Sequence, residues 1–314
     1  MPLNQALRKA NINEFLRAIS NFIVAFIPES SWFYRKMALL GLKLTEKKRL
    51  SKRKILRFDI PIVDHCNLSC KYCCTFSPIA EKTFVDVQQL SLDLHNLSKI
   101  TNGQMEDIAL IGGEPLLHPK LIEIMDVARK YFASGEIAFV TNGTLLRKQP
   151  DEFWNACRRN RIGIKITHYP IKLDFESLKN KAEKEEVSLA YVGGSGNNAP
   201  PIKSMWKRPF DLNGAQDLEH SWKYCNEANY CIRLKDGKIY PCGTVQSVIH
   251  FNKYFNTNMV VSKDDVLELD KVHNLDELLT FLSTPRQFCK YCKRKDITTG
   301  LKWEISKKEI SEWV

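Results

Sequence analysis

The residues best able to carry chemistry are four cysteines in one short stretch, Cys66, Cys70, Cys73 and Cys74. The first three have the spacing C-x3-C-x2-C and follow an apolar run. Thiolates are the usual protein ligands of iron–sulfur clusters, and three on one loop can bind three irons of a [4Fe–4S] cluster. The fourth iron is then open to a substrate or cofactor, as in catalytic metal sites. Cys74 is a poor fourth ligand, because adjacent residues rarely turn both sulfurs toward one small cluster.

This stretch resembles the signature of the radical S-adenosylmethionine (radical SAM) superfamily, C-x3-C-x-Φ-C, in which Tyr72 takes the aromatic position Φ. The resemblance implies that Cys66, Cys70 and Cys73 hold a [4Fe–4S] cluster. Its open iron would bind S-adenosylmethionine (SAM), which is split to a 5′-deoxyadenosyl radical. A zinc site or a disulfide knot is the alternative, but zinc knots usually show two C-x2-C pairs rather than an odd triplet.

A second candidate segment, Gly112-Gly113-Glu114-Pro115, follows a predicted strand. Glycines let the backbone approach a ligand closely, and a carboxylate accepts charge-assisted hydrogen bonds from an ammonium group. The segment is similar to the GGEP motif of radical SAM enzymes. That similarity implies that its backbone and Glu114 hold the amino group of SAM.

Two further loops carry weaker signals. Thr141-Asn142-Gly143 is similar to the family's loop near the SAM ribose, although Asn-Gly is also a generic turn. His168 follows another predicted strand, where it could contact cofactor or substrate. A lone histidine at a strand end can equally be structural.

Strands and helices alternate after residue 57, which predicts a parallel sheet or barrel with crossover helices. We expect strands at 58–63, 107–111, 136–141, 163–167 and 187–192, and helices at 85–100, 119–132, 149–159 and 174–185. The resemblance implies a partial (β/α)6 barrel of radical SAM type, although no clear sixth unit is visible. The motifs above follow the ends of these strands, where parallel folds build active sites.

A second cysteine set occupies the C-terminal third: Cys225, Cys231, Cys242, Cys289 and Cys292. Asp236-Gly237 predicts a two-residue hairpin, which would pair Cys231 with Cys242 on one face. The set resembles the SPASM and twitch extensions of radical SAM enzymes. The resemblance implies one auxiliary [4Fe–4S] cluster on Cys231, Cys242, Cys289 and Cys292, in a small α+β domain. A zinc ribbon is the alternative.

Cys225 is the alternative to Cys231 as the first ligand of this cluster. If Cys225 is not a ligand, its thiol is a candidate hydrogen-atom donor to a substrate radical. Both assignments are open from the sequence.

The 314 residues suit one large domain or two smaller ones, and we predict three segments: 1–57, 58–200 and 201–314. The first is a helical, basic extension, the second the radical SAM core, and the third the auxiliary-cluster domain. The net charge of +11 concentrates at residues 43–57, which is either a solvated linker or a site for an anionic surface or phosphate group. Helical spacing in the extension also allows an interfacial hairpin.

Ten cysteines without a secretory signal favour a cytoplasmic protein, either soluble or peripheral to the membrane. The resemblance implies a radical SAM oxidoreductase or epimerase acting on a small polar or saccharide substrate. It also implies an external one-electron reductant such as flavodoxin or ferredoxin, and no nucleic-acid partner is expected. The alternatives are a maturase of ribosomal peptides and, from another class, a non-enzymatic iron–sulfur electron carrier or zinc-binding scaffold.

Overall fold

The structure is a computed structural model that describes residues 57–192, 202–225, 227–228 and 231–314. These residues belong to one compact unit, Ile55–Val314. Apart from Arg57, the predicted basic extension and its charged stretch lie outside the described residues. The predicted division near residue 200 stays a prediction.

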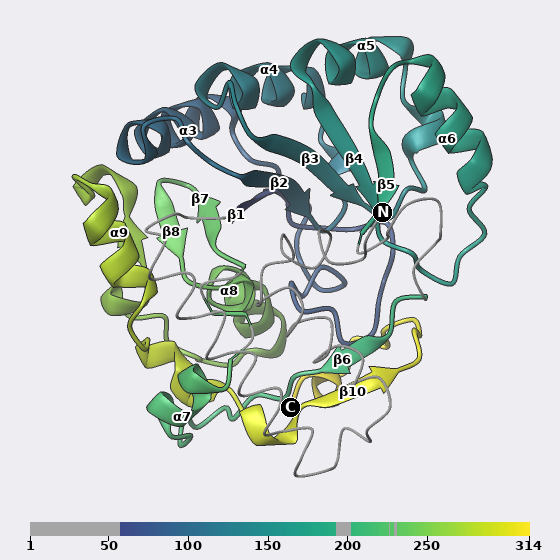
Figure 1. The fold of residues 1–314 in the computed structure, drawn as a ribbon. Helices are drawn as coiled ribbons and strands as arrows, with labels where there is room; N and C mark the ends of the chain where they lie inside the picture. Colours follow the sequence, from purple (N-terminus) through teal and green to yellow (C-terminus); the bar gives the residue numbers. More distant parts are fainter. Residues whose placement is uncertain (1–56, 193–201, 226, 229–230) are drawn as a thin grey trace, which may run out of the picture. The chain divides into compact units, whose positions relative to one another are not determined.

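The main sheet of the fold has eight strands, in the order β5-β4-β3-β2-β1-β7-β8-β9 (Figure 1). Its five consecutive parallel strands are β1 (Arg57–Val63), β2 (Asp107–Gly112), β3 (Glu136–Thr141), β4 (Ile162–Ile166) and β5 (Leu189–Tyr191). They confirm the five predicted strands. Strand β1 is buried from Phe58 to Val63, which its nearly continuous apolar sequence predicts for a parallel strand covered on both faces.

Four helices connect these strands and lie along one side of the sheet (Figure 1): α3 (Val87–Thr101), α4 (Leu121–Tyr131), α5 (Asp151–Asn160) and α6 (Phe175–Lys184). Helix α3 begins where the side chain of Asp86 accepts the Gln89 N–H (2.9 Å). It ends at Asn102, which adopts the left-handed conformation common at helix ends. All four helices were predicted from the sequence.

The sixth parallel strand comes from the C-terminal third of the chain. Strand β7 (Arg233–Lys235) pairs with β1 through Asp59 and Arg233, and the Asp59 N–H donates to the Ile232 carbonyl (2.8 Å). Antiparallel strands β8 (Lys238–Tyr240) and β9 (Leu267–Glu268) extend the sheet. The mixed α/β fold of radical SAM type is therefore confirmed, with its sixth parallel strand in the predicted hairpin.

The remaining strands and α-helices lie C-terminal to β5. They are β6 (Met205–Lys207) and β10 (Thr298–Leu301), which pair antiparallel, and helices α7 (Leu218–Lys223), α8 (Gly243–Phe255) and α9 (Leu275–Leu282). Short 3-10 helices are η1 (Pro115–Leu117), η2 (Leu146–Lys148), η3 (Lys263–Asp265), η4 (Leu269–Lys271), η5 (Gln287–Tyr291), η6 (Arg294–Asp296) and η7 (Ile310–Glu312).

A second apolar cluster joins the cysteine loop to the C-terminal region. The ring of Phe76 lies 5.4 Å from that of Phe251 and 5.9 Å from those of Phe210 and Trp313, measured between centroids. The Trp313 indole N–H also donates to the Cys73 carbonyl (3.0 Å). The loop that holds the first cysteines is therefore packed against the end of the chain.

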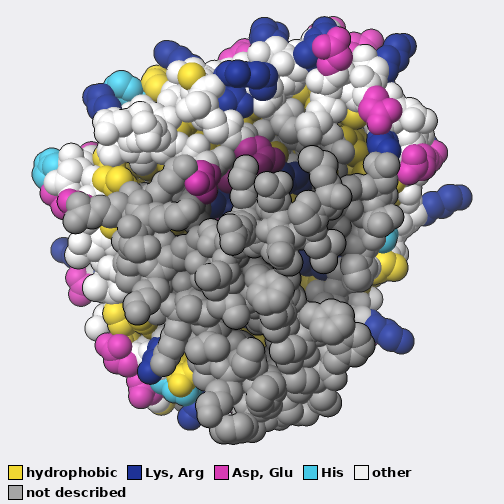
Figure 2. Space-filling model, in the orientation of Figure 1, with side chains coloured by type: hydrophobic (Ala, Val, Ile, Leu, Met, Phe, Trp, Pro, Cys, Tyr) yellow, Lys and Arg dark blue, Asp and Glu magenta, His cyan; other side chains and the backbone are white. Residues whose placement is uncertain are grey.

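Basic and acidic side chains are interspersed over the outer helices of the sheet in the view of Figure 2. None of the described helices is long and apolar enough to cross a membrane.

Two leucines of α3 test the packing of this helix on the sheet. Leu94 has 0% exposure and Leu92 has 52%. We expect Leu94→Ala to lower the free energy of unfolding by about 2–5 kcal/mol, because it leaves a cavity in the core. Leu92→Ala should change it by less than about 0.5 kcal/mol. Thermal unfolding of the two variants measures the difference, and equal melting temperatures would contradict the packing.

Candidate active site

The first cysteine triplet lies on the loop after β1, and hydrogen-bond donors surround its sulfurs. The Leu68 N–H donates to Cys66 Sγ (3.3 Å), and the Trp303 indole N–H donates to Cys70 Sγ (3.1 Å). Cys73 Sγ lies 3.3 Å from the Thr75 hydroxyl. Donors aimed at sulfur favour the thiolate form that binds metal.

The three thiols also lie near one another. Burial raises the pKa of Cys66 to about 12, and the neighbouring Glu114, Cys73 and Cys70 add to this effect. Burial raises the pKa of Cys70 to about 11, and Cys73 again contributes. Such thiols gain most from a metal partner, because a metal stabilises the thiolate that the site otherwise disfavours.

Cys74 has different neighbours from the triplet. Its side chain is accessible, yet burial by the surrounding protein raises its pKa; Glu227 also raises the pKa, and Arg208 and Arg233 lower it. The prediction that Cys74 does not bind the first cluster is consistent with this place and stays a prediction.

The Gly112-Gly113 turn touches the start of the cysteine loop. A Cβ atom at Gly112 would lie 2.1 Å from the Val63 carbonyl oxygen, and one at Gly113 would lie 2.1 Å from that of His65. The Gly113 N–H donates to Val63 O (2.8 Å), and the Glu114 N–H donates to His65 O (3.0 Å). The glycines therefore let the two loops approach, because any side chain would clash with backbone.

Glu114 is fully buried and connects the ends of β2 and β3. Its carboxylate accepts hydrogen bonds from the Thr141 hydroxyl (2.6 Å), the Asn142 N–H (2.9 Å) and the Leu116 N–H (3.1 Å). Burial raises the pKa of Glu114 to about 6, although each of these three hydrogen bonds lowers it. An ionised carboxylate offers about four acceptor sites, so one remains for a further donor.

Asn142 carries this network to the cysteine loop. Its side-chain amide donates to Asn67 (2.8 Å) and lies 3.8 Å from Cys66 Sγ. The structure therefore brings Glu114, Thr141 and Asn142 together beside the cysteine triplet. Pro115 begins the 3-10 helix η1, for which Glu114 is the N-terminal cap.

Tyr72 and His168 occupy the edges of this region. Tyr72 adopts a left-handed backbone (φ 61°), and the ammonium of Lys71 lies 5.2 Å from its ring centroid. The His168 ring lies 4.9 Å from that of Tyr191. Contacts of Tyr72 and His168 with a cofactor stay predictions.

Tyr169 is a residue of this site that the sequence analysis missed. Its side chain lies beside Cys70 and lowers the pKa of that thiol. Burial raises its pKa well above the usual range, and Cys70, Cys73 and Cys66 add to the effect. Tyr169 follows His168 after the end of β4, and this position after a parallel strand could have marked it as a site residue. Nothing in the sequence around Trp303, far along the chain, marks it as a neighbour of Cys70.

The second cysteine set gathers Cys225, Cys242, Cys289 and Cys292. Burial raises the pKa values of Cys289 and Cys292 to about 11 and about 12, and Cys225 contributes to both. Burial also raises the pKa of Cys242 well above its usual range, with Cys225 and Cys292 as neighbours. Arg294 donates a hydrogen bond to Cys225 Sγ, so its charge faces the set.

Cys231 lies outside this set. Burial raises its pKa to about 12, and its charged neighbours are Glu227, Asp59 and Arg233, with Cys74 nearby. The structure thus groups Cys225, the alternative to Cys231 as first ligand, with Cys242, Cys289 and Cys292. It places Cys231, which hairpin geometry favoured as the first ligand, near Asp59 of β1 and Arg233 of β7.

The hairpin itself forms as predicted, with Asp236 and Gly237 in left-handed conformations at the turn (φ 50° and 72°). Its ladder ends at the pair Arg233–Tyr240 and does not reach Cys231 and Cys242. The expected pairing of these two cysteines is therefore wrong. Cys242 instead precedes α8 as its N-terminal cap.

Within the described ranges, no three His, Cys, Asp or Glu side chains converge closely enough to hold a single metal ion. A zinc site needs its ligand atoms within about 2.3 Å of one centre. A cubic cluster takes one thiolate on each iron, so its ligands lie farther apart. The choice between a cluster and one zinc ion for the second set stays a prediction.

Comparison with known proteins identifies the family. A model described as the radical SAM superfamily matches residues 60–188, which include the triplet and the GGEP segment. Residues 60–188 therefore belong to this superfamily. Radical SAM proteins use a [4Fe–4S] cluster and SAM, and the chain is a radical SAM enzyme.

Relatives of the chain include curated GTP 3′,8-cyclases. The one of Peptoclostridium acidaminophilum is 23% identical over 274 residues, 83% of this chain and 82% of that protein. The one of Microcystis aeruginosa is 33% identical over 111 residues, 34% of this chain and 33% of that protein. Among solved structures, BtrN in complex with AdoMet and 2-DOIA is 15% identical, with a TM-score of 0.43 over 76% of this chain and 92% of BtrN.

One prediction separates the two candidate ligands of the second set. If the second set holds a cluster through Cys225, Cys225→Ala should remove about half of the iron from the reconstituted radical SAM enzyme, because one of the two predicted clusters loses a ligand. Cys231→Ala is the matched control and should keep the full iron content. Iron and sulfide analysis with absorption spectroscopy measures both, and the reverse pattern would make Cys231 the ligand.

A second prediction concerns Glu114. Glu114→Gln should weaken SAM binding roughly ten- to a hundredfold, because it removes a charge-assisted hydrogen bond of ~1.5–3 kcal/mol to the ammonium. Glu123→Gln on the exposed side of α4 is the control. Calorimetric titration of SAM into the cluster-loaded enzyme measures both affinities. An unchanged dissociation constant for Glu114→Gln would count against the contact.

Proposed function

We propose that this radical SAM enzyme abstracts hydrogen from a small polar substrate, a saccharide among the candidates, and so oxidises or epimerises it. The observation that carries this proposal is the meeting of Cys66, Cys70 and Cys73 with the GGEP turn at the carboxyl ends of β1 and β2. When bound, the cluster and SAM supply the electron and the 5′-deoxyadenosyl radical that this chemistry needs.

The chain's own residues position this chemistry. Gly113 and Glu114 fix the turn against the cysteine loop through two backbone hydrogen bonds. Glu114 retains one acceptor site that suits an ammonium group. Trp303 donates to Cys70 and Tyr169 lies beside it, and both favour the thiolate of Cys70. A one-electron reductant such as flavodoxin or ferredoxin, and a cytoplasmic location, belong to the same proposal.

The second cysteine set supports an auxiliary [4Fe–4S] cluster of the SPASM or twitch kind. Four cysteines can ligate all four irons, which leaves no iron open to the substrate. Such a cluster would serve electron transfer, and Arg294 beside Cys225 would stabilise its negative charge. If the substrate radical gives an electron to this cluster and a proton to solvent, the overall reaction is an oxidation. If a free thiol returns a hydrogen atom, the reaction is an epimerisation, and the resulting thiyl radical takes an electron from the external reductant and a proton from solvent.

Cys225 is a weaker candidate for the hydrogen-atom donor than its sequence context suggested, because it lies with the other ligands. Cys231 and Cys74 are thiols outside both proposed ligand sets. The mass of the product distinguishes the two outcomes, since oxidation removes two hydrogen atoms and epimerisation leaves the mass unchanged.

A nucleoside triphosphate is the second candidate substrate. The curated relatives are named GTP 3′,8-cyclases, and one is similar over most of both chains. Incubation of the reduced enzyme with SAM and GTP tests this candidate, because a cyclisation yields a product that mass spectrometry separates from GTP breakdown. Peptide maturation is the remaining enzymatic alternative.

Removal of the first triplet tests the proposed function. Cys66, Cys70 and Cys73 changed together to Ala should abolish release of 5′-deoxyadenosine and remove about half of the iron, because three ligands of one cluster are lost. Cys74→Ser is the matched control and should keep both. Chromatography of the reduced, SAM-treated proteins measures cleavage. Cleavage by the triple variant would refute the site, and no cleavage by the unmodified protein would favour an electron carrier.

A further inference from the structure

Arg233 is a buried cation whose hydrogen-bonding capacity is largely unused. It lies on β7 with 7% exposure, and its Nε and Nη1 atoms have no hydrogen-bond partner among the described residues. A buried charge without hydrogen bonds costs several kcal/mol, so such groups usually have a partner. The arginine therefore calls for an anionic or polar ligand.

The nearest carboxylate satisfies Arg233 only in part. Asp59 Oδ2 lies 3.6 Å from Arg233 Nη2, beyond hydrogen-bond distance. Its other oxygen accepts a 2.7 Å hydrogen bond from the Nε of Arg57. One carboxylate is thus shared by two guanidinium groups, and the unpartnered N–H groups of Arg233 face elsewhere.

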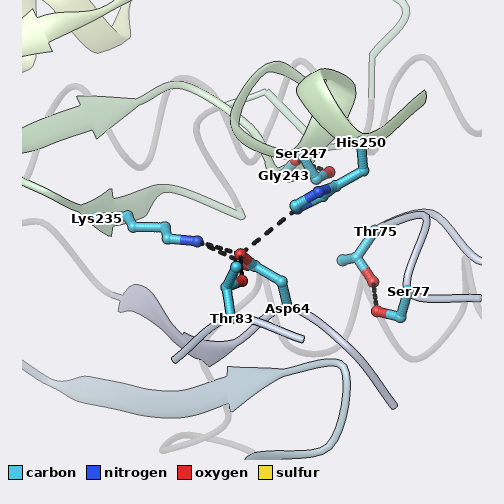
Figure 3. Close-up of polar contacts among 8 residues, drawn as sticks. All are labelled: Asp64, Thr75, Ser77, Thr83, Lys235, Gly243, Ser247 and His250. Carbon is cyan, nitrogen blue, oxygen red and sulfur yellow. Dashed lines mark hydrogen bonds and ion pairs between the residues drawn. The ribbon is translucent and has the colours of Figure 1, made fainter. Parts of the chain in front are cut away.

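The carboxylate of Asp64, which lines a small cavity together with Arg233, is already bound by other groups. Both oxygens of Asp64 lie 2.7 Å from the ammonium of Lys235, and the Thr83 hydroxyl donates to the same carboxylate (Figure 3). His250 reaches toward it from α8, with Nε2 at 3.6 Å. These neighbours hold the pKa of Asp64 well below its usual range. Asp64 therefore has little capacity left for Arg233.

Arg233 lines a cavity of about 10 Å³, room for one water molecule or one ligand oxygen, at the carboxyl ends of β1 and β2. The other lining residues are Pro61, Val63, Asp64, Thr75, Gly112, Gly113, Gln246 and Ser247. Thr75 belongs to the first cysteine loop, and Gly112 and Gly113 to the GGEP turn. The cavity thus adjoins the proposed SAM site.

The start of α8 forms the opposite wall. A Cβ atom at Gly243 would lie 2.9 Å from Arg233 Nη2, so the guanidinium packs against this glycine. The 13-residue helix points its N-terminus at the same region. The positive end of its dipole adds to the charge of Arg233, which favours an anion there.

We propose that Arg233, which packs against the start of α8, binds an oxygen of an anionic group of the substrate, a carboxylate or a phosphate, at the carboxyl ends of β1 and β2. This inference rests on the proposed function and defines its substrate class as an anionic small molecule. The bidentate geometry of a guanidinium suits either group. The anion would lie between the first cysteine loop and Cys242, the cap of α8, so the reacting carbon would be held near both cysteine sets.

Anion binding to the reconstituted enzyme tests the proposal. Inorganic phosphate and acetate are titrated separately into the cluster-loaded protein with SAM bound, and calorimetry measures each affinity. We expect at least one anion to bind the unmodified enzyme, and the tighter one identifies phosphate or carboxylate. Arg233→Gln should weaken that binding by roughly tenfold to a hundredfold. Arg158→Gln, an exposed position on α5, is the control for general charge and should bind as the unmodified enzyme does.

A second variant covers the case in which Arg233→Gln does not fold. Gly243→Ala keeps the charge but displaces the guanidinium, and it should also weaken the binding. Binding of neither anion, or equal binding by Arg233→Gln and the unmodified enzyme, would overturn the anion site. The proposed function is judged separately by release of 5′-deoxyadenosine from the unmodified enzyme. If the enzyme releases 5′-deoxyadenosine but binds neither anion, only the anion site is refuted. If it binds an anion but releases no 5′-deoxyadenosine, only the radical chemistry is refuted.

Discussion

The buried carboxylate of Glu114 joins the strand ends from which the site is built. It accepts hydrogen bonds from Thr141 and Asn142, and Asn142 continues to Asn67 in the cysteine loop. Its backbone N–H donates to His65 at the start of that loop. Because burial raises its pKa only to about 6, the group is ionised at neutral pH, and its three donors offset much of the desolvation cost.

A second constraint comes from the far end of the chain. Trp303 and Trp313 donate their indole N–H groups to Cys70 and to the Cys73 carbonyl. The Lys71 N–H donates to the Glu304 carbonyl (2.9 Å) between them. A buried tryptophan N–H needs a partner, so these contacts fix the loop and satisfy the indoles together. The first cysteine loop is thus held by β2 and β3 on one side and by the C-terminal segment on the other.

The sequence predicted those parts of the fold and site that depend on local patterns. Cysteine spacing, the GGEP segment, the Asp236-Gly237 turn and the five parallel strands each lie within a few consecutive residues. Contacts between distant segments escaped prediction. The pairing of β7 with β1 depends on a single pair of residues, and nothing local marks Tyr169 or Trp303 as neighbours of Cys70. The predicted pairing of Cys231 with Cys242 is wrong because the β7–β8 ladder ends at the pair Arg233–Tyr240 and stops two residues short of each cysteine.

That early end of the ladder has a consequence for the chemistry. Since β8 stops at Tyr240, the chain can turn at Cys242 and begin α8 at once. The helix start then contacts two sites, through Cys242 in the second cysteine set and through Gly243 against Arg233. Cys231, released from the ladder, lies on the Arg233 side with Asp59. The connection between β8 and α8 therefore places a ligand of the proposed auxiliary cluster, Cys242, next to the glycine that contacts Arg233. The cluster site and the charged residues around Arg233 are distinct but adjacent. Adjacency of this kind is what electron transfer from a substrate radical to a closed cluster requires.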